Sequence, residues 1–144
     1  MPQFQQHRFA MQLAQLSRAW RAELDRRLVG LGLSQTSRLI QIHLARFDTP
    51  PTQRELAQSV GVEGPTLARL LDGLEAQGLV SRQAVAEDRR AKQITLSAKA
   101  QPLIEQIEAI STQLRQELFA GIDPVDLQHC QRVQERILAN LEKH

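Results

Sequence analysis

Hydrophobic residues recur every three or four positions at both ends of the chain, which is the pattern of amphipathic helices. In the N-terminal part they form a single stripe: Phe9, Leu13, Leu16, Trp20, Leu24, Leu28 and Leu31. This stripe predicts a first helix from about Arg8 to Val29, which Gly30 and Gly32 end. Ser34 is a typical N-cap residue, and the apolar positions after it predict a second, buried helix.

The C-terminal third carries the helical pattern twice. Its two stripes are Leu103, Ile107, Ile110, Leu114 and Leu118, then Leu127, Cys130, Val133, Ile137 and Leu141. Gly121 separates them, Asp123 is a suitable N-cap, and Pro124 fits the first helical position, where a backbone N–H is not needed. We therefore expect two further amphipathic helices and a buried thiol at Cys130.

The middle of the chain predicts a helix-turn-helix. Thr52 and Glu55 have the spacing of a capping box, and Gly61 can adopt the left-handed conformation of a sharp turn. A second short helix opens around residues 64–66 and turns its leucines inward. Its outer face presents Pro65, Thr66 and Arg69, and an arginine there can reach guanine in a major groove. The alternative is an ordinary helical hairpin with a surface arginine.

Residues 79–85 and 92–96 follow this helix and predict two short strands joined by a loop at 86–91. Within the loop, Asp88 can brace the turn, while Arg89 and Arg90 project from its tip toward a narrow minor groove. The net charge is only +2, but basic residues concentrate here: Arg82, Arg89, Arg90, Lys92 and Lys99. The alternative is that this charged run is only a solvated turn. Because the run directly follows the second helix of the predicted helix-turn-helix, we favour a DNA-binding wing.

Three segments resemble the winged-helix signature of MarR-family regulators, and in particular the SlyA-like branch. They are residues 88–92 (Asp-Arg-Arg-Ala-Lys), 74–82 (Leu-Glu-Ala-Gln-Gly-Leu-Val-Ser-Arg) and 96–99 (Leu-Ser-Ala-Lys). Similar short matches at residues 18–21, 33–36, 67–69 and 120–122 extend the resemblance over nearly the whole chain. The resemblance implies a homodimer, joined by its terminal helices, that binds pseudo-palindromic promoter DNA and represses or antirepresses transcription.

By position, the resemblance makes Arg69 the main major-groove contact and Arg90 the minor-groove contact. Many relatives also respond to a small aromatic or phenolic ligand, held between the dimerisation helices and the DNA-binding lobe. Arg18, Trp20 and Arg38 are the candidates for that ligand site, and the alternative is that Trp20 packs in the core and the arginines form surface pairs. SlyA-like chains tend to have aromatic and histidine residues where this one has Arg38 and Ile42, which argues against a salicylate-type response.

The expected fold is mainly α with a small β-hairpin wing: a winged helix-turn-helix at residues 34–96, and a helical dimerisation region at 1–33 and 97–144. The chain of 144 residues has no apolar run of membrane-spanning length and no signal peptide, so we expect a cytoplasmic protein. The four histidines lack metal-ligand spacing, and neither a phosphate loop nor a nucleophile elbow is present. We therefore expect a protein without enzymatic activity that binds no metal and no cofactor. The alternative to a function in binding double-stranded DNA is a winged helix that binds another protein.

Overall fold

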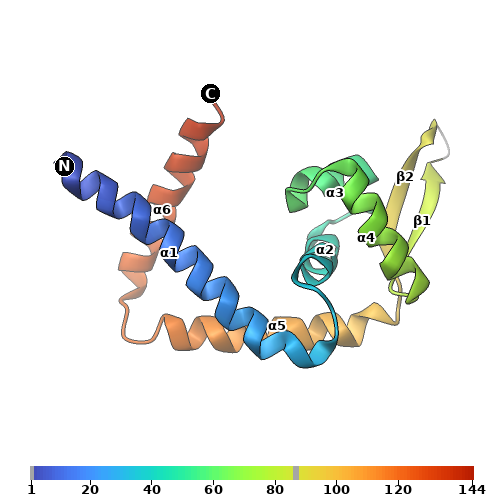
Figure 1. The fold of residues 1–144 in the computed structure, drawn as a ribbon, viewed down its shortest axis with the longest axis horizontal. Coiled ribbons are helices and arrows are strands. Elements are labelled where there is room, and N and C mark those ends of the chain that lie inside the picture. Colours follow the sequence, from blue (N-terminus) through green and yellow to red (C-terminus); the bar gives the residue numbers. More distant parts are fainter. Residues whose placement is uncertain (1, 86–87) are drawn as a thin grey trace. The chain divides into compact units, whose positions relative to one another are not determined.

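The computed structural model describes residues 2–85 and 88–144, except for the side chains of residues 88–90 (Figure 1). The elements in chain order are α1 (Gln3–Leu28), the 3-10 helix η1 (Val29–Leu31), α2 (Gln35–Arg46), α3 (Gln53–Val60), α4 (Gly64–Ala76), β1 (Val80–Val85), β2 (Asp88–Leu96), α5 (Ala100–Leu118) and α6 (Pro124–Leu141). This order confirms the mainly α fold with a β-hairpin. The chain divides within α5 into compact units at residues 1–111 and 112–144. No helix in the described part of the chain has the length and apolar character to cross a membrane.

The helices begin where the predicted capping residues stand. The Ser34 hydroxyl accepts a hydrogen bond from the Ser37 backbone N–H, 3.1 Å away. Thr52 and Glu55 form both hydrogen bonds of the capping box, at 3.1 Å and 3.4 Å. Gly61 has φ of 81°, the left-handed conformation that ends α3 without steric cost. Local sequence signals therefore set these helix boundaries; only α1 differs, since it begins at Gln3 rather than near Arg8.

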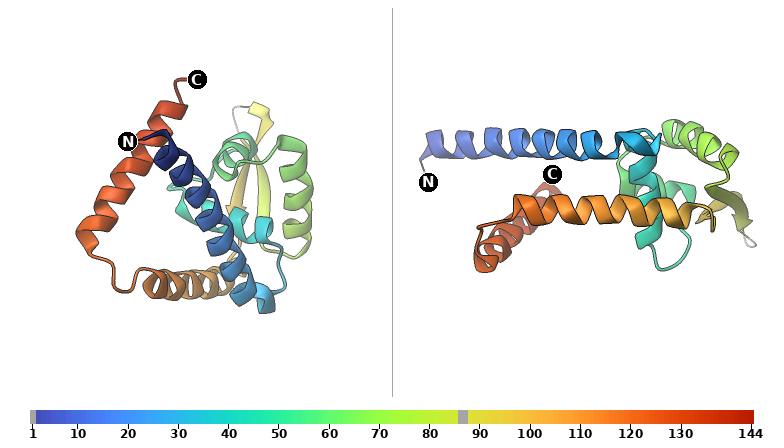
Figure 2. Two further views of the ribbon diagram at one scale, coloured as in Figure 1. Left: turned by 60° about the vertical axis from the view of Figure 1, so that its left-hand side comes forward. Right: turned by 90° about the horizontal axis from the view of Figure 1, so that it is seen from below.

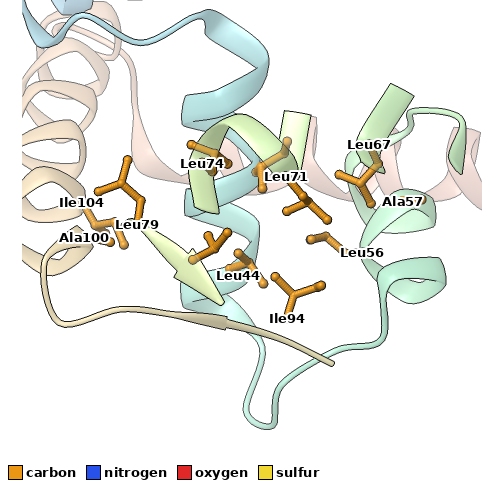
Figure 3. Close-up of a cluster of buried hydrophobic side chains, with 12 residues drawn as sticks. Leu44, Leu56, Ala57, Leu67, Leu71, Leu74, Leu79, Ile94, Ala100 and Ile104 are labelled. Atoms are coloured by element: carbon orange, nitrogen blue, oxygen red, sulfur yellow. The ribbon is translucent and has the colours of Figure 1, made fainter. Parts of the chain in front are cut away.

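A hydrophobic core joins the helix-turn-helix to the hairpin and to the start of α5 (Figure 3). Its buried members are Ile40, Leu44, Leu56, Ala57, Leu67, Leu71, Leu74, Leu79, Val80, Ile94, Ala100 and Ile104. Three of them are the inward leucines predicted for α4, and Leu70 is half-buried beside them. Because these helices and strands share one core, the orientation of α4 relative to the hairpin is set by packing.

The hairpin is longer than the sequence predicted. β1 and β2 pair antiparallel, with Val80 opposite Leu96 and Arg82 opposite Ile94. β2 already begins at Asp88, so the prediction of a loop over residues 86–91 was wrong for residues 88–91. Asp has little strand propensity, but Asp88 pairs with Val85 on β1, and the register shifts between Ala84 and Val85, so that residues 89–91 form an irregularity in the ladder. The Ile94 N–H also donates to the Pro51 carbonyl at 2.9 Å, which ties β2 to the chain entering α3.

Two helices keep large apolar side chains in solvent. On α1 these are Phe4, Phe9, Met11, Leu13 and Leu16, and on α6 they are Val125, Val133, Leu138 and Leu141. No residue of α6 is buried, and Cys130 is exposed, so the expectation of a buried thiol was wrong for the single chain. The unit at residues 112–144 consists of α6 and the end of α5, and one neighbouring helix end is too small to bury α6. In the described residues these side chains therefore form exposed apolar surfaces, of the kind that an amphipathic helix usually buries against a partner.

Candidate nucleic-acid interface

The outer face of α4 carries the predicted major-groove residues. Pro65 and Arg69 are exposed and Thr66 is half-buried, whereas Leu67 and Leu71 hold the opposite face in the core. Pro65 lies in the first turn, as predicted. Arg69 has no hydrogen bond or ion pair with any residue that the structure describes, so its guanidinium is available to a ligand. The structure thus brings these residues together on one accessible surface.

The hairpin runs beside this helix. β1 returns antiparallel to α4 after the turn at Gly78, so its Val85 end lies at the same end of the lobe as the start of α4 (Figures 1 and 2). Arg89 and Arg90 belong to β2 instead of a loop tip. The side chains of Arg89, Arg90 and Asp88 lie outside the described residues, so their contacts with DNA and the bracing role of Asp88 stay predictions.

Arg82 has a role that the sequence analysis missed, since we had grouped it with the residues that meet phosphates. Its side chain is only 16% exposed, and its Nε donates to Glu75 Oε2 at 3.2 Å. Its Nη2 donates to Asp72 Oδ1. These hydrogen bonds, that to Asp72 first, raise the pKa of the guanidinium, because both carboxylates favour its charged form. The signal was the strand alternation, which places Arg82 on the face of the hairpin shared with buried Ile94.

Lys99 is also engaged. Its Nζ donates to the Gln77 carbonyl at 2.9 Å, at the end of α4, where a positive charge suits the helix dipole. The Ser97 hydroxyl donates to the neighbouring Gly78 carbonyl. Arg82 therefore fastens the hairpin to α4, and Lys99 fastens the turn after β2 to the end of α4. Lys92 on β2 is exposed. The positive surface available to phosphates is smaller than the count of basic residues suggested.

The three candidate ligand residues lie in different environments. Arg38 is 7% exposed, and its guanidinium donates to the Asp25 carboxylate of α1 and to the Leu33 carbonyl. Trp20 is half-buried on α1 and Arg18 is exposed. Arg38 thus links α1 to α2 in this structure, and ligand binding by the three residues stays a prediction. The described residues include no cluster of His, Cys, Asp or Glu suited to a metal ion.

Comparison with known proteins gives the family. Residues 31–91 match a model of the MarR family. The crystal structure of the transcriptional regulator PA3341 is 65% identical, with 94% of this chain and 99% of that chain covered and a TM-score of 0.88. Two structures share the fold at 22% identity. The S. aureus MepR–DNA complex has a TM-score of 0.81 over 92% of this chain and 97% of that chain. CouR from Rhodococcus jostii RHA1, bound to p-coumaroyl-CoA, has 0.79 over 90% of each chain. With its winged helix-turn-helix and an identity of 65% over nearly the full length of one such regulator, the chain belongs to the MarR family of transcriptional regulators.

Proposed function

We propose that this chain acts as a homodimer that binds a pseudo-palindromic promoter duplex through two copies of α4 and the hairpin. The observation that carries this proposal is the exposed Arg69, which has no partner among the described residues and lies on a helix whose opposite face packs in the core. A free guanidinium on a rigid helix is the arrangement that reads guanine O6 and N7 in a major groove. The similarity to MepR, whose structure is a DNA complex, supports the same use of the fold.

In this arrangement each residue of the interface has a separate role. Arg69 reads a base, while Pro65 and Thr66 bring the start of α4 close to the DNA backbone, where helical N–H groups favour phosphate. Arg90 enters the minor groove, with Arg89 beside it and Asp88 bracing the wing. The short motifs at residues 74–82 and 88–92 favour the SlyA-like branch of the family.

The dimer is formed by residues 1–33 and 97–144, and residues 34–96 form the DNA-binding lobe. The exposed apolar residues of α1 and α6 support this division, because soluble monomers rarely leave so many large apolar side chains in water. A second copy of the chain would cover them. In a two-fold dimer the two α4 helices would lie roughly 34 Å apart, which places half-sites about one DNA turn apart.

A small aromatic or phenolic ligand would regulate this dimer. CouR supports the idea, since its structure holds p-coumaroyl-CoA on the same fold. Arg18, Trp20 and Arg38 are the proposed ligand residues, and an acidic ligand would compete with Asp25 for the Arg38 guanidinium. We propose that the protein works in the cytoplasm as a regulator without catalytic activity.

The test is a selection of bound sequences from random duplex DNA, followed by affinity measurements on the selected site over a range of salt. We expect affinity to fall steeply with salt, as counterion release requires. Arg69→Ala should relax base preference at one position per half-site, while Arg90→Ala should weaken binding to all sequences. Arg46→Ala is the matched control, because it removes a largely exposed arginine of α2 that lies outside α4, the hairpin and the segments assigned to the dimer.

Two results would contradict the proposal. Salt-insensitive binding would exclude a phosphate-based interface, and equal affinity of Arg69→Ala, Arg90→Ala and wild type would exclude the assigned residues. A folded dimer that selects no duplex would favour the rival function, a winged helix that binds protein.

A further inference from the structure

The recognition helix carries a negative charge close to its proposed reading residue. Asp72 follows Arg69 by three positions on α4, and its side chain is 67% exposed. Residues three apart on a helix are neighbours, and an Asp–Arg pair at this spacing forms readily. Such a pair would occupy the Arg69 guanidinium and place a carboxylate toward the phosphates. The sequence of α4 alone therefore opposes the function of Arg69.

The fold removes this conflict with a second arginine. Arg82 extends from the inner face of β1, donates through Nη2 to Asp72, and anchors its Nε on Glu75 at 3.2 Å. Its side chain is 16% exposed, so it is held by packing as well as by charge. Arg69 meanwhile has no partner among the described residues. Asp72 is thus bound to the hairpin instead of to its neighbour on the helix.

We propose that Arg82 is a positioning residue of the DNA interface: by binding Asp72, it keeps that carboxylate from pairing with Arg69. The inference rests on the proposed reading of DNA by Arg69. Arg82 itself touches no DNA in this arrangement. It leaves the positive charge of Arg69 on the outer face of α4 without a neighbouring carboxylate bound to it. The same contacts fasten β1 to α4, so the wing and the recognition helix approach DNA as one body.

The test uses the full chain and a duplex selected by the wild type. Arg82→Gln should weaken binding about tenfold at moderate salt, roughly the effect of one close charge interaction. The double variant Arg82→Gln with Asp72→Asn should recover most of that loss, because the competing carboxylate is gone. Arg82→Gln with Glu75→Gln is the matched control. It removes the other carboxylate bound by Arg82, that of Glu75, which is about 1.7 helical turns from Arg69, and should recover little.

The single variant Asp72→Asn tests the proposal without replacing the half-buried Arg82, so that misfolding cannot explain its result. Asp72 is largely exposed, so Asp72→Asn should leave the fold intact and bind at least as tightly as the wild type. Weaker binding by Asp72→Asn would overturn the proposal. So would unchanged binding by Arg82→Gln, or equal recovery in the two double variants, which would reveal only a general effect of charge.

Failure of the proposed function gives a different result. If the wild type selects no duplex, DNA reading by Arg69 is wrong and the role of Arg82 falls with it. If the wild type binds and Arg69→Ala relaxes base preference, but the Asp72 substitution restores nothing, only the role of Arg82 is wrong.

Discussion

The link between Arg38 and Asp25 offers a sharp test of how α1 is held to the DNA-binding lobe. Arg38 is buried on α2, and its two donor contacts are the Asp25 carboxylate and the Leu33 carbonyl. Asp25→Ala leaves the buried guanidinium with only the carbonyl. Removing a hydrogen bond to a charged group costs about 1.5–3 kcal/mol. Since Asp25 is 37% exposed, solvent screens the pair, and we expect about 1.5 kcal/mol.

Arg38→Met is the informative comparison. It removes the buried charge together with its contacts, and Asp25 can turn to water. Replacing a buried charge by an apolar side chain of similar length often costs little. We therefore expect Arg38→Met to stay within about 1 kcal/mol of the wild type, and so to be more stable than Asp25→Ala.

Chemical denaturation measures both variants at fixed protein concentration, because the proposed dimer would make stability depend on concentration. Thermal unfolding should agree, with a shift of roughly 2–4 °C per kcal/mol at this chain length. If Asp25→Ala unfolds at the wild-type midpoint, Asp25 does not satisfy Arg38 in solution. If Arg38→Met is the less stable of the two, packing of the arginine outweighs its charge.

Two further predictions concern the dimer and the pH dependence of stability. Leu16→Glu places a charge in the exposed apolar stripe of α1 and should shift the protein to monomers in sedimentation, whereas Gln15→Glu, its neighbour, should not; a dimer that survives Leu16→Glu would place the interface elsewhere. Burial, and then the charge of Arg46, lower the pKa of His43, whose Nδ1 lies 2.6 Å from the Ser59 hydroxyl. The folded protein therefore favours neutral His43, and stability should decline as pH falls below about 6.5 toward the lowered pKa. His43→Gln should lack this part of the decline in denaturation midpoints measured from pH 8 to 5, and an unchanged profile would exclude His43 as its source.

Local signals in the sequence predicted most of the helix-turn-helix. The capping box at Thr52, the N-cap at Ser34 and the left-handed turn at Gly61 each depend on residues within four positions, so the sequence pattern contains all the information they need. The inward leucines of α4 follow from the helical period alone. The exposure of Arg69 then follows, since it lies opposite them on the helix.

Features that depend on the packing of separate elements were missed or wrong. The partners of Arg82 lie across a turn on another element, and recognising them requires the strand face and the path of the chain together. The start of β2 at Asp88 depends on pairing with β1, which overrides local propensity. The apolar stripe around Cys130 predicted a buried helix face. A stripe does not distinguish burial within one chain from burial against a second copy, and in the single chain Cys130 is exposed.

The contacts of the lobe suggest where a regulator of this design is adjustable. Within the lobe, the leucines of α4 pack in the core, and Arg82 and the Pro51–Ile94 hydrogen bond hold the hairpin in place. A ligand is therefore not expected to change the shape of the lobe. The link from α2 to α1 includes a partly exposed carboxylate, Asp25, which binds the buried Arg38. A ligand can shift an equilibrium only through different affinities for two states. A ligand that competed for Arg38, as proposed above, would provide such a difference, because it would weaken the Arg38–Asp25 contact between α2 and α1 and leave α4 and the hairpin intact. We therefore expect an effector to change the spacing of the two lobes and not the shape of either one.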